Sequence, residues 1–220
     1  MNHAQTVGQL AAERPASVKV FHRHGIDFCC GGGISLEQAC EKRGLDTTEV
    51  RREIADEENR NPGDPDAWQS RPLGELIDHI VASYHRPLDE ELPRLEGLAR
   101  KVARVHGERH PELQPLLEAC LELAQDLGPH MMKEEQVLFP AIGVGNKGFI
   151  PQPIEVMQME HETMGELLAG IRELTGGFVV PEDACGSFRA LFNGLEALEQ
   201  SLHEHIHLEN NILFPRALRE

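Results

Sequence analysis

Apolar residues recur at steps of three and four residues over most of the chain after residue 72. Four segments show this spacing: residues 72–105, 111–139, 153–174 and 182–218. In the first segment the apolar stripe contains Leu73, Leu76, Ile77 and Ile80. Such stripes are typical of amphipathic helices that pack their apolar faces together. The pattern therefore predicts an all-α protein with a four-helix bundle over residues 72–220.

Residues 1–58 show a different pattern, of short helices that have their own start and stop signals. The candidate caps and stops are Thr6, Pro15, Ser35 with Gln38, Gly44, and Thr47 or Thr48. Residues 59–71, NRNPGDPDAWQSR, concentrate Asn, Pro, Gly and Asp, which is typical of a linker. We therefore expect a small helical domain (1–58), a linker (59–71) and the bundle (72–220).

The composition supports this helical reading and excludes several classes of partner. Of the 220 residues, 5% are aromatic, which favours helix over sheet. The formal net charge of −16 argues against nucleic acid or an anionic membrane as a partner. No apolar run reaches membrane-spanning length, and the start, MNHAQT, does not resemble a signal peptide. Five Cys without disulfide-scaffold spacing predict a reducing compartment, the cytoplasm.

A stretch of sequence that occurs twice indicates a duplicated helical hairpin. His130 opens HMMKEEQVLFPAI and His205 opens HIHLENNILFPRA, which share the His, a Glu four residues later and Leu-Phe-Pro. His85 lies upstream of the first copy at nearly the separation of His161 from the second. Residues four apart lie on one face of a helix. Each half of the bundle therefore presents one His and one His-x-x-x-Glu pair.

Six side chains follow from this pattern as candidate metal ligands: His85, His130, Glu134, His161, His205 and Glu209. Neutral imidazole and carboxylate together suit iron, manganese or zinc. A carboxylate can bind two ions through its two oxygens, so Glu134 and Glu209 are candidate bridges. A four-helix bundle can hold two metal ions in its core with such ligands. Two His per ion and shared carboxylates leave open positions for a small ligand.

The remaining His residues have less support as ligands. His203 and His207 lie roughly 200° around the helix from His205, so we expect both at the surface. We also expect His106, in RVHGERHP, at the surface rather than beside a metal.

Three further residues adjoin the candidate ligands in the sequence. Glu135 and Glu160 can hydrogen-bond a ligand, line an entry path or remain solvated charges. Pro87 lies inside the first long helix and predicts a kink beside His85, because proline removes one backbone hydrogen bond.

These residues, with HGIDFCCGGGISLEQAC and HMMKEEQVLFPAI, resemble the iron–sulfur cluster repair di-iron family, also called repair of iron centres. The resemblance covers nearly the whole chain. It implies a small N-terminal domain with a Cys-Cys pair before a hemerythrin-like bundle. It also implies a non-haem di-iron centre with the four His as terminal ligands and Glu134 and Glu209 as bridges. Members of this family are cytoplasmic and help to restore iron–sulfur proteins damaged by nitric oxide or peroxide.

Cys29 and Cys30 form the adjacent pair and are followed by three glycines. Glycine permits unusual backbone geometry and the close approach of another surface. Exposed thiolates at this position can relay electrons, trap nitric oxide or hold iron in transit. A pair of buried small residues is the structural alternative, and the family resemblance favours the functional one.

The predicted function is repair of stress-damaged iron–sulfur clusters by iron supply, with two iron ions as cofactor and damaged iron–sulfur proteins as partners. Two alternatives use the same site: a nitric oxide reductase that receives electrons through Cys29 and Cys30, and a sensor of oxygen or nitric oxide. Turnover of nitric oxide favours the enzyme, iron transfer favours repair, and reversible binding alone favours the sensor. The oligomeric state stays open, with a homodimer among the alternatives.

Overall fold

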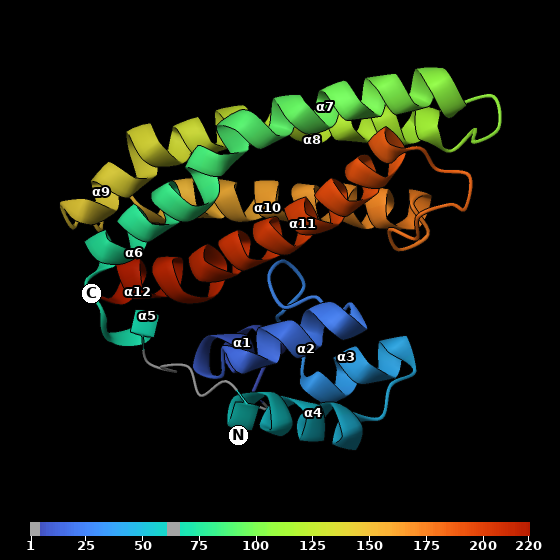
Figure 1. The fold of residues 1–220 in the computed structure, drawn as a ribbon. Helices are drawn as coiled ribbons and strands as arrows, with labels where there is room; N and C mark the ends of the chain where they lie inside the picture. The colour runs from blue at the N-terminus through green and yellow to red at the C-terminus, as the bar shows by residue number, and fades with distance from the viewer. Residues whose placement is uncertain (1–4, 61–66) are drawn as a thin grey trace. The chain divides into compact units, whose positions relative to one another are not determined.

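The computed structural model describes residues 5–60 and 67–220, and their regular structure is helical (Figure 1). Within these ranges the one strand-like feature is an isolated bridge between Thr6 and Ser35. The predicted all-α class is confirmed. The chain divides into two compact units, residues 78–202 and residues 1–77 with 203–220. In the described part of the chain, no helix is long and apolar enough to cross a membrane.

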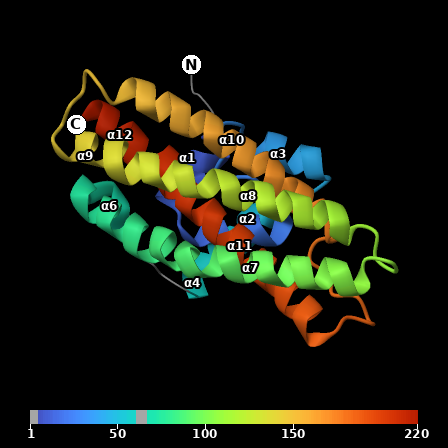
Figure 2. The same cartoon turned by 90° about the horizontal axis from the view of Figure 1, so that it is seen from above.

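The unit of residues 78–202 contains most of the long helices. Its elements are the π-helical turn η1 (Val81–His85), α7 (Arg86–His106), α8 (Leu113–Lys133), the π-helical turn η2 (Glu134–Leu138), α9 (Phe139–Gly143), α10 (Pro151–Leu174) and most of α11 (Gly186–Leu208). Helix α8 packs against both α7 and α10 and lies between them in Figure 2. The buried core includes Leu95, Leu116, Leu123, Leu168, Phe188 and Leu195. Apolar residues of α7, α8, α10 and α11 thus meet in one helical core.

The second unit contains the short N-terminal helices and the C-terminal end of the chain. Its elements are α1 (Val7–Glu13), α2 (Ala16–His24), α3 (Leu36–Arg43), α4 (Thr47–Arg60), α5 (Ala67–Ser70), the start of α6 (Leu73–Ile80), the last turn of α11, the π-helical turn η3 (Glu209–Leu213) and α12 (Phe214–Arg219). Thr6 and Ser35 form capping boxes with Gln9 and Gln38, as the polar pattern predicts for Ser35. Ile206 joins the buried core of α1 to α4.

The predicted linker, residues 59–71, lies partly outside the described residues, because 61–66 are not among them. Helix α4 continues to Arg60, and α5 occupies four of the linker positions. The separation of residues 1–58 from 72–220 as two independent domains therefore stays a prediction.

Three of the long helical segments contain a π-helical turn that is followed by a proline. The prolines are Pro87, Pro140 and Pro215, each the second residue after its turn. The residue before each proline donates its N–H to the carbonyl five residues earlier: Arg86 to Val81, Phe139 to Glu134, and Phe214 to Glu209. Proline has no N–H and clashes with the carbonyl four residues before it, and the wider π turn accommodates both effects. The second long helix therefore continues past its predicted end at Phe139 to Gly143.

Candidate metal centre

Each π-helical turn carries one of the predicted metal ligands at one of its ends. His85 ends η1, Glu134 begins η2 and Glu209 begins η3, and π turns are frequent at functional sites. The other three ligands, His130, His161 and His205, lie on α8, α10 and α11. All six side chains are at most 2% exposed. Burying so many polar groups is costly unless something compensates them.

Four of the six lie in the unit of residues 78–202, where their polar atoms face one another. The Nε2 atom of His85 lies 3.5 Å from one Glu134 oxygen, and Nε2 of His130 lies 3.4 Å from the other. The Nε2 atom of His161 lies 3.1 Å from Nε2 of His130. Glu134 is therefore approached by an imidazole nitrogen at each of its two carboxylate oxygens.

The remaining two ligands lie four residues apart in the segment of residues 203–220. The Nε2 atom of His205 lies 3.2 Å from a carboxylate oxygen of Glu209. The spacing places both side chains on one face of the continuous helix that α11 and η3 form.

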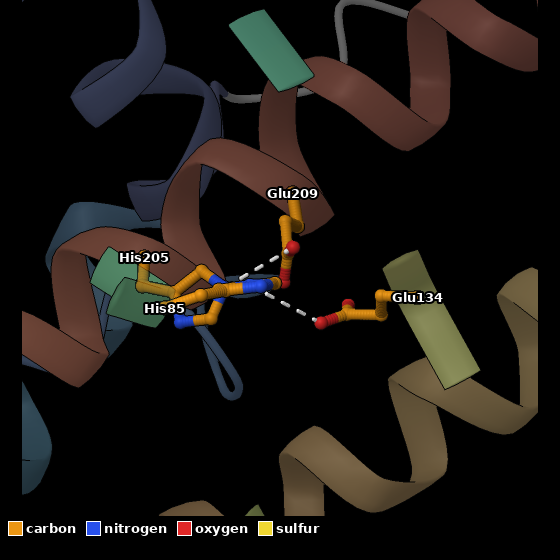
Figure 3. Close-up of side chains that lie close together, drawn as sticks. All are labelled: His85, Glu134, His205 and Glu209. Carbon is orange, nitrogen blue, oxygen red and sulfur yellow. Dashed lines mark hydrogen bonds and ion pairs between the residues drawn. The ribbon is translucent and has the colours of Figure 1, made fainter. Parts of the chain in front are cut away.

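The ligand atoms of these residues form two groups, each within 4.8 Å: His85, Glu134, His205, Glu209, and His130, Glu134, His161, Glu209. Figure 3 shows the first group, with the carboxylates of Glu134 and Glu209 turned toward the two imidazoles. Each of the six candidate ligands belongs to at least one of the two groups. Both carboxylates belong to both groups, as a pair of bridging ligands requires.

Glu135 and Glu160 hold two of the ligand imidazoles from the side opposite to Glu134. The Glu135 carboxylate lies 3.0 Å from Nδ1 of His85, and the Glu160 carboxylate lies 2.9 Å from Nδ1 of His130. Because a carboxylate accepts, Nδ1 of each imidazole carries a proton, and in a neutral imidazole this leaves Nε2, which faces Glu134, as the atom with the lone pair. Both residues therefore hydrogen-bond a candidate ligand, and Glu160 also lines a cavity.

Basic side chains keep both outer carboxylates ionised. Arg86 pairs with Glu135, and Lys133 pairs with Glu160. Partial burial acts to raise the pKa of each carboxyl, but the hydrogen bonds with the imidazole and the basic side chain outweigh it. The pKa of Glu135 and that of Glu160 therefore lie below their ordinary value. The ionised carboxylates in turn hold the Nδ1 protons in place.

The surroundings of Glu134 test whether this donor set fits a cation. The carboxylate is fully buried, and neither oxygen has a hydrogen-bond donor among the described residues. Nε2 of His85 and Nε2 of His130 lie 3.5 Å and 3.4 Å from its two oxygens, and the lone pair that Nε2 carries in a neutral imidazole repels a carboxylate when nothing lies between them. A cation bonded at about 2.1 Å to each ligand separates neighbouring donors by roughly 3.0–3.4 Å. The residues fit a metal ion, which would compensate their burial.

A cavity of about 220 Å³ opens beside the second ligand group. It is lined by Asp126, Pro129, His130, Lys133, Glu160, Thr163 and Met164. The wall thus includes the candidate ligand His130, the Glu160 carboxylate that hydrogen-bonds it, and the acidic side chain of Asp126. This arrangement gives small ions or molecules a path toward His130.

The Cys29–Cys30 loop lies in the other unit, after α2. The two sulfur atoms lie 3.5 Å apart and do not form a disulfide. The Asp27 carboxylate accepts hydrogen bonds from the backbone N–H groups of Cys29, Cys30 and Gly31. This carboxylate fixes the turn in which both thiols sit.

The two thiols differ in exposure, so neither an exposed pair nor a buried pair describes them. Cys29 is buried, at 5% exposed, because it packs in the core of α1 to α4, and Cys30 is half-buried. The contact with Cys30, the burial and the nearby Asp27 carboxylate raise the pKa of Cys29 well above its ordinary value. Cys30 is therefore the member of the pair that solvent reaches.

Two His residues expected at the surface are buried, so those predictions are wrong. His207 packs against Phe28 in the same unit, and burial lowers the pKa of His207 to about 4. His106 packs against Phe188, and its Nε2 lies 3.2 Å from the sulfur of Cys185. Helical periodicity along one segment shows that His207 faces away from His205. It does not show that another segment covers that face.

Comparison with known proteins agrees with these observations. The family described as the hemerythrin HHE cation binding domain matches residues 76–217, and a domain of unknown function, DUF542, matches residues 3–58. The chain is 39% identical over 217 residues to a probable iron-sulfur cluster repair protein of Haemophilus influenzae, covering 98% of this chain and 97% of the relative. It is 40% identical to the iron-sulfur cluster repair protein YtfE of Pectobacterium atrosepticum and 41% identical to that of Yersinia pseudotuberculosis. Each of these two matches spans 215 residues, 98% of this chain and 97% of the relative.

Proposed function

Since this chain belongs to the family of iron–sulfur cluster repair proteins with a hemerythrin HHE cation binding domain, we propose that it repairs damaged iron–sulfur clusters by supplying iron. The predicted family and the hemerythrin-like bundle are confirmed by these matches. The iron in this proposal is held as a pair of ions in the bundle and is also the cargo that a damaged protein receives.

The buried Glu134 carboxylate carries the proposal. An imidazole Nε2 atom lies beside each of its two oxygens, and neither oxygen has a hydrogen-bond partner in the described chain. We assign His85 and His205 to one iron and His130 and His161 to the other. Glu134 and Glu209 would hold both ions in this assignment, which is supported by their membership in both ligand groups. Iron bound there supplies Lewis acidity and one-electron chemistry.

The ligand chemistry suits a store that must release its contents. Imidazole and carboxylate suit mononuclear or paired iron ions, whereas thiolates select zinc, copper(I) and iron–sulfur clusters. The cavity beside His130 provides a route on which Glu160 and Asp126 offer further oxygen ligands. Damaged iron–sulfur proteins are the partners that such a route would serve, and nitric oxide or oxygen can bind at open iron positions. All five cysteines are free thiols, which fits a cytoplasmic site of action.

The test compares the parent with Glu134→Ala, and with Glu162→Ala as the matched control, because Glu162 is exposed on α10. We expect two irons per chain in the parent and the control, and a lost or disrupted pair in Glu134→Ala. The parent should rebuild the cluster of an iron–sulfur protein that nitric oxide has stripped, and Glu134→Ala should not.

Two results would overturn the proposal. One tightly held zinc ion, unaffected by Glu134→Ala, would exclude a di-iron store. Catalytic consumption of nitric oxide with a reductant, without any iron transfer to the apo protein, would favour the reductase instead.

A further inference from the structure

We propose that Asn210 and Asn211 are positioning residues that couple the Cys29–Cys30 loop to the iron ligand Glu209. The inference rests on the proposed function, because it takes Glu209 as a ligand of iron. It adds a link by which filling of the iron site changes the position and reactivity of the Cys30 thiol.

The coupling starts from three consecutive residues of η3. Glu209 begins the π-helical turn, and Asn210 and Asn211 follow it directly. The Asn210 side chain donates from Nδ2 to the carbonyl oxygen of Cys29, at 3.2 Å. The Asn211 side chain donates from Nδ2 to the carbonyl oxygen of Phe28, at 3.1 Å. The backbone carbonyls of Phe28 and Cys29 are thus held by the two residues that follow Glu209.

Asn211 is itself held on two further sides. Its Nδ2 lies 3.0 Å from Nδ1 of the buried His207, one helical turn earlier. A Cβ atom added at Gly8 of α1 would lie 2.3 Å from the Asn211 Oδ1 atom. The Asn211 amide therefore fits at this position only because Gly8 has no side chain. Such a confined side chain cannot follow the loop by changing rotamer, so it transmits a movement of η3.

The Cys loop responds as one piece, because its own hydrogen bonds make it stiff. Asp27 accepts hydrogen bonds from the N–H groups of Cys29, Cys30 and Gly31. The Gly8 N–H also donates to the carbonyl of Gly32, at 2.9 Å. A displacement that enters at the carbonyls of Phe28 and Cys29 therefore reaches Cys30.

The charge state of Glu209 decides which position of η3 is favoured. Glu209 is fully buried, and Nε2 of His205 lies 3.2 Å from one of its carboxylate oxygens. A bound iron ion would neutralise this buried carboxylate and favour the position of η3 that holds the loop. When iron is removed, the buried charge disfavours this position, so η3 shifts and the loop is held less firmly. A ligand shifts such an equilibrium only by its differential affinity for the two states, and typical couplings change a measured constant by roughly 5- to 150-fold.

The experiment measures the alkylation rate of Cys30 by iodoacetamide under anaerobic conditions, with fragment-ion mass spectrometry to separate Cys30 from Cys29. The full-length parent is compared after loading with ferrous iron and after removal of iron by a chelator. We expect iron to slow the alkylation of Cys30 by about fivefold or more. In Asn210→Ala/Asn211→Ala we expect the iron content to stay at the parent level and the two rates to become equal.

Gly8→Ala provides an independent variant, because it displaces the Asn211 amide without changing any residue of η3. Alanine is otherwise favourable within a helix, so α1 should remain folded. We expect this variant to lose the dependence of Cys30 alkylation on iron. Asn193→Ala, which replaces an exposed Asn on α11, should keep the parent behaviour.

The outcomes separate this inference from the proposed function. A parent chain that binds no iron contradicts the proposed function. Two irons bound with no effect on Cys30 contradicts the coupling alone. Slower alkylation that persists in Asn210→Ala/Asn211→Ala would mean that iron protects the thiols directly, which also overturns the coupling. A double variant that loses its iron would make both Asn residues part of the site's structure, and Gly8→Ala then decides the question.

Discussion

The carboxylate of Glu160 on α10 lies 2.9 Å from Nδ1 of His130 on α8 and thereby turns Nε2 of this imidazole toward Glu134. We predict that Glu160→Ala weakens iron binding by about 10- to 100-fold, since the imidazole loses its orientation and some of its basicity. Glu160→Gln keeps one acceptor oxygen, so its iron affinity should lie between that of the parent and that of Glu160→Ala. Competition with a coloured iron chelator measures the affinity of each protein.

The matched control is Glu162→Ala, which removes an exposed carboxylate two residues away on the same helix. It should bind iron as the parent does. Equal losses in the two variants would show that the general negative charge of α10, and not the contact with His130, sets the affinity.

A second prediction concerns Pro140 and the π-helical turn before it. Pro140→Ala restores a backbone N–H and removes the clash with the carbonyl four residues earlier, so η2 can rewind as an ordinary α-helix. Rewinding rotates His130 and Glu134 by about 100° relative to the buried Phe139. We expect iron affinity to fall by about tenfold while the melting temperature of the iron-free protein stays the same or rises. Both are measured on the same preparations.

Pro93→Ala is the control, because Pro93 also lies inside a helix, α7, but no π turn ends two residues before it. This variant should gain or keep stability and bind iron normally. If Pro140→Ala also binds iron as the parent does, the π turn does not depend on its proline.

The bundle and four of its candidate ligands could be predicted from the sequence because both depend on local spacing, whereas His85 and His161 were found through their nearly equal separations from the two copies of the repeat. The stripes of apolar residues gave four helices, and the duplicated His-x-x-x-Glu placed two ligands on one face of each of two helices. The π turns went unpredicted, although the proline after each copy of Leu-Phe is a signal for them. The burial of His207 went unpredicted for a different reason. It depends on Phe28, which lies far away along the chain, and periodicity carries no information on such a contact.

The five thiols should differ sharply in their reaction with iodoacetamide. Burial raises the pKa of Cys120 to about 12, so at pH 8 only about one molecule in 10⁴ carries the reactive thiolate there. Cys29 also has a raised pKa, and Cys40 is fully buried. We predict that the native iron-free protein is labelled at the exposed Cys185 and at Cys30, and that the other three react only in denaturant. Mass spectrometry of the digested protein locates the labels, and fast labelling of Cys29 would contradict the burial of that thiol.

His207 should make the iron-free protein less stable in weak acid. Its pKa is about 4 when folded, because burial disfavours the charged imidazole and a hydrogen bond with the backbone of Phe28 offsets this only in part. In the unfolded chain the pKa is near the ordinary 6.5, so between these two values the unfolded state binds the extra proton. The stability that the neutral His207 provides is therefore complete above pH 6.5 and is lost as the pH falls from 6.5 toward 4. From pH 7 to pH 5 this loss amounts to about 2 kcal/mol. His207→Gln keeps an acceptor for the Asn211 amide but does not titrate, so the free energy of unfolding in urea should fall by about 2 kcal/mol less than in the parent over this range. Equal losses in the two proteins would mean that His207 is protonated in the folded state and that the other His residues cause the acid sensitivity.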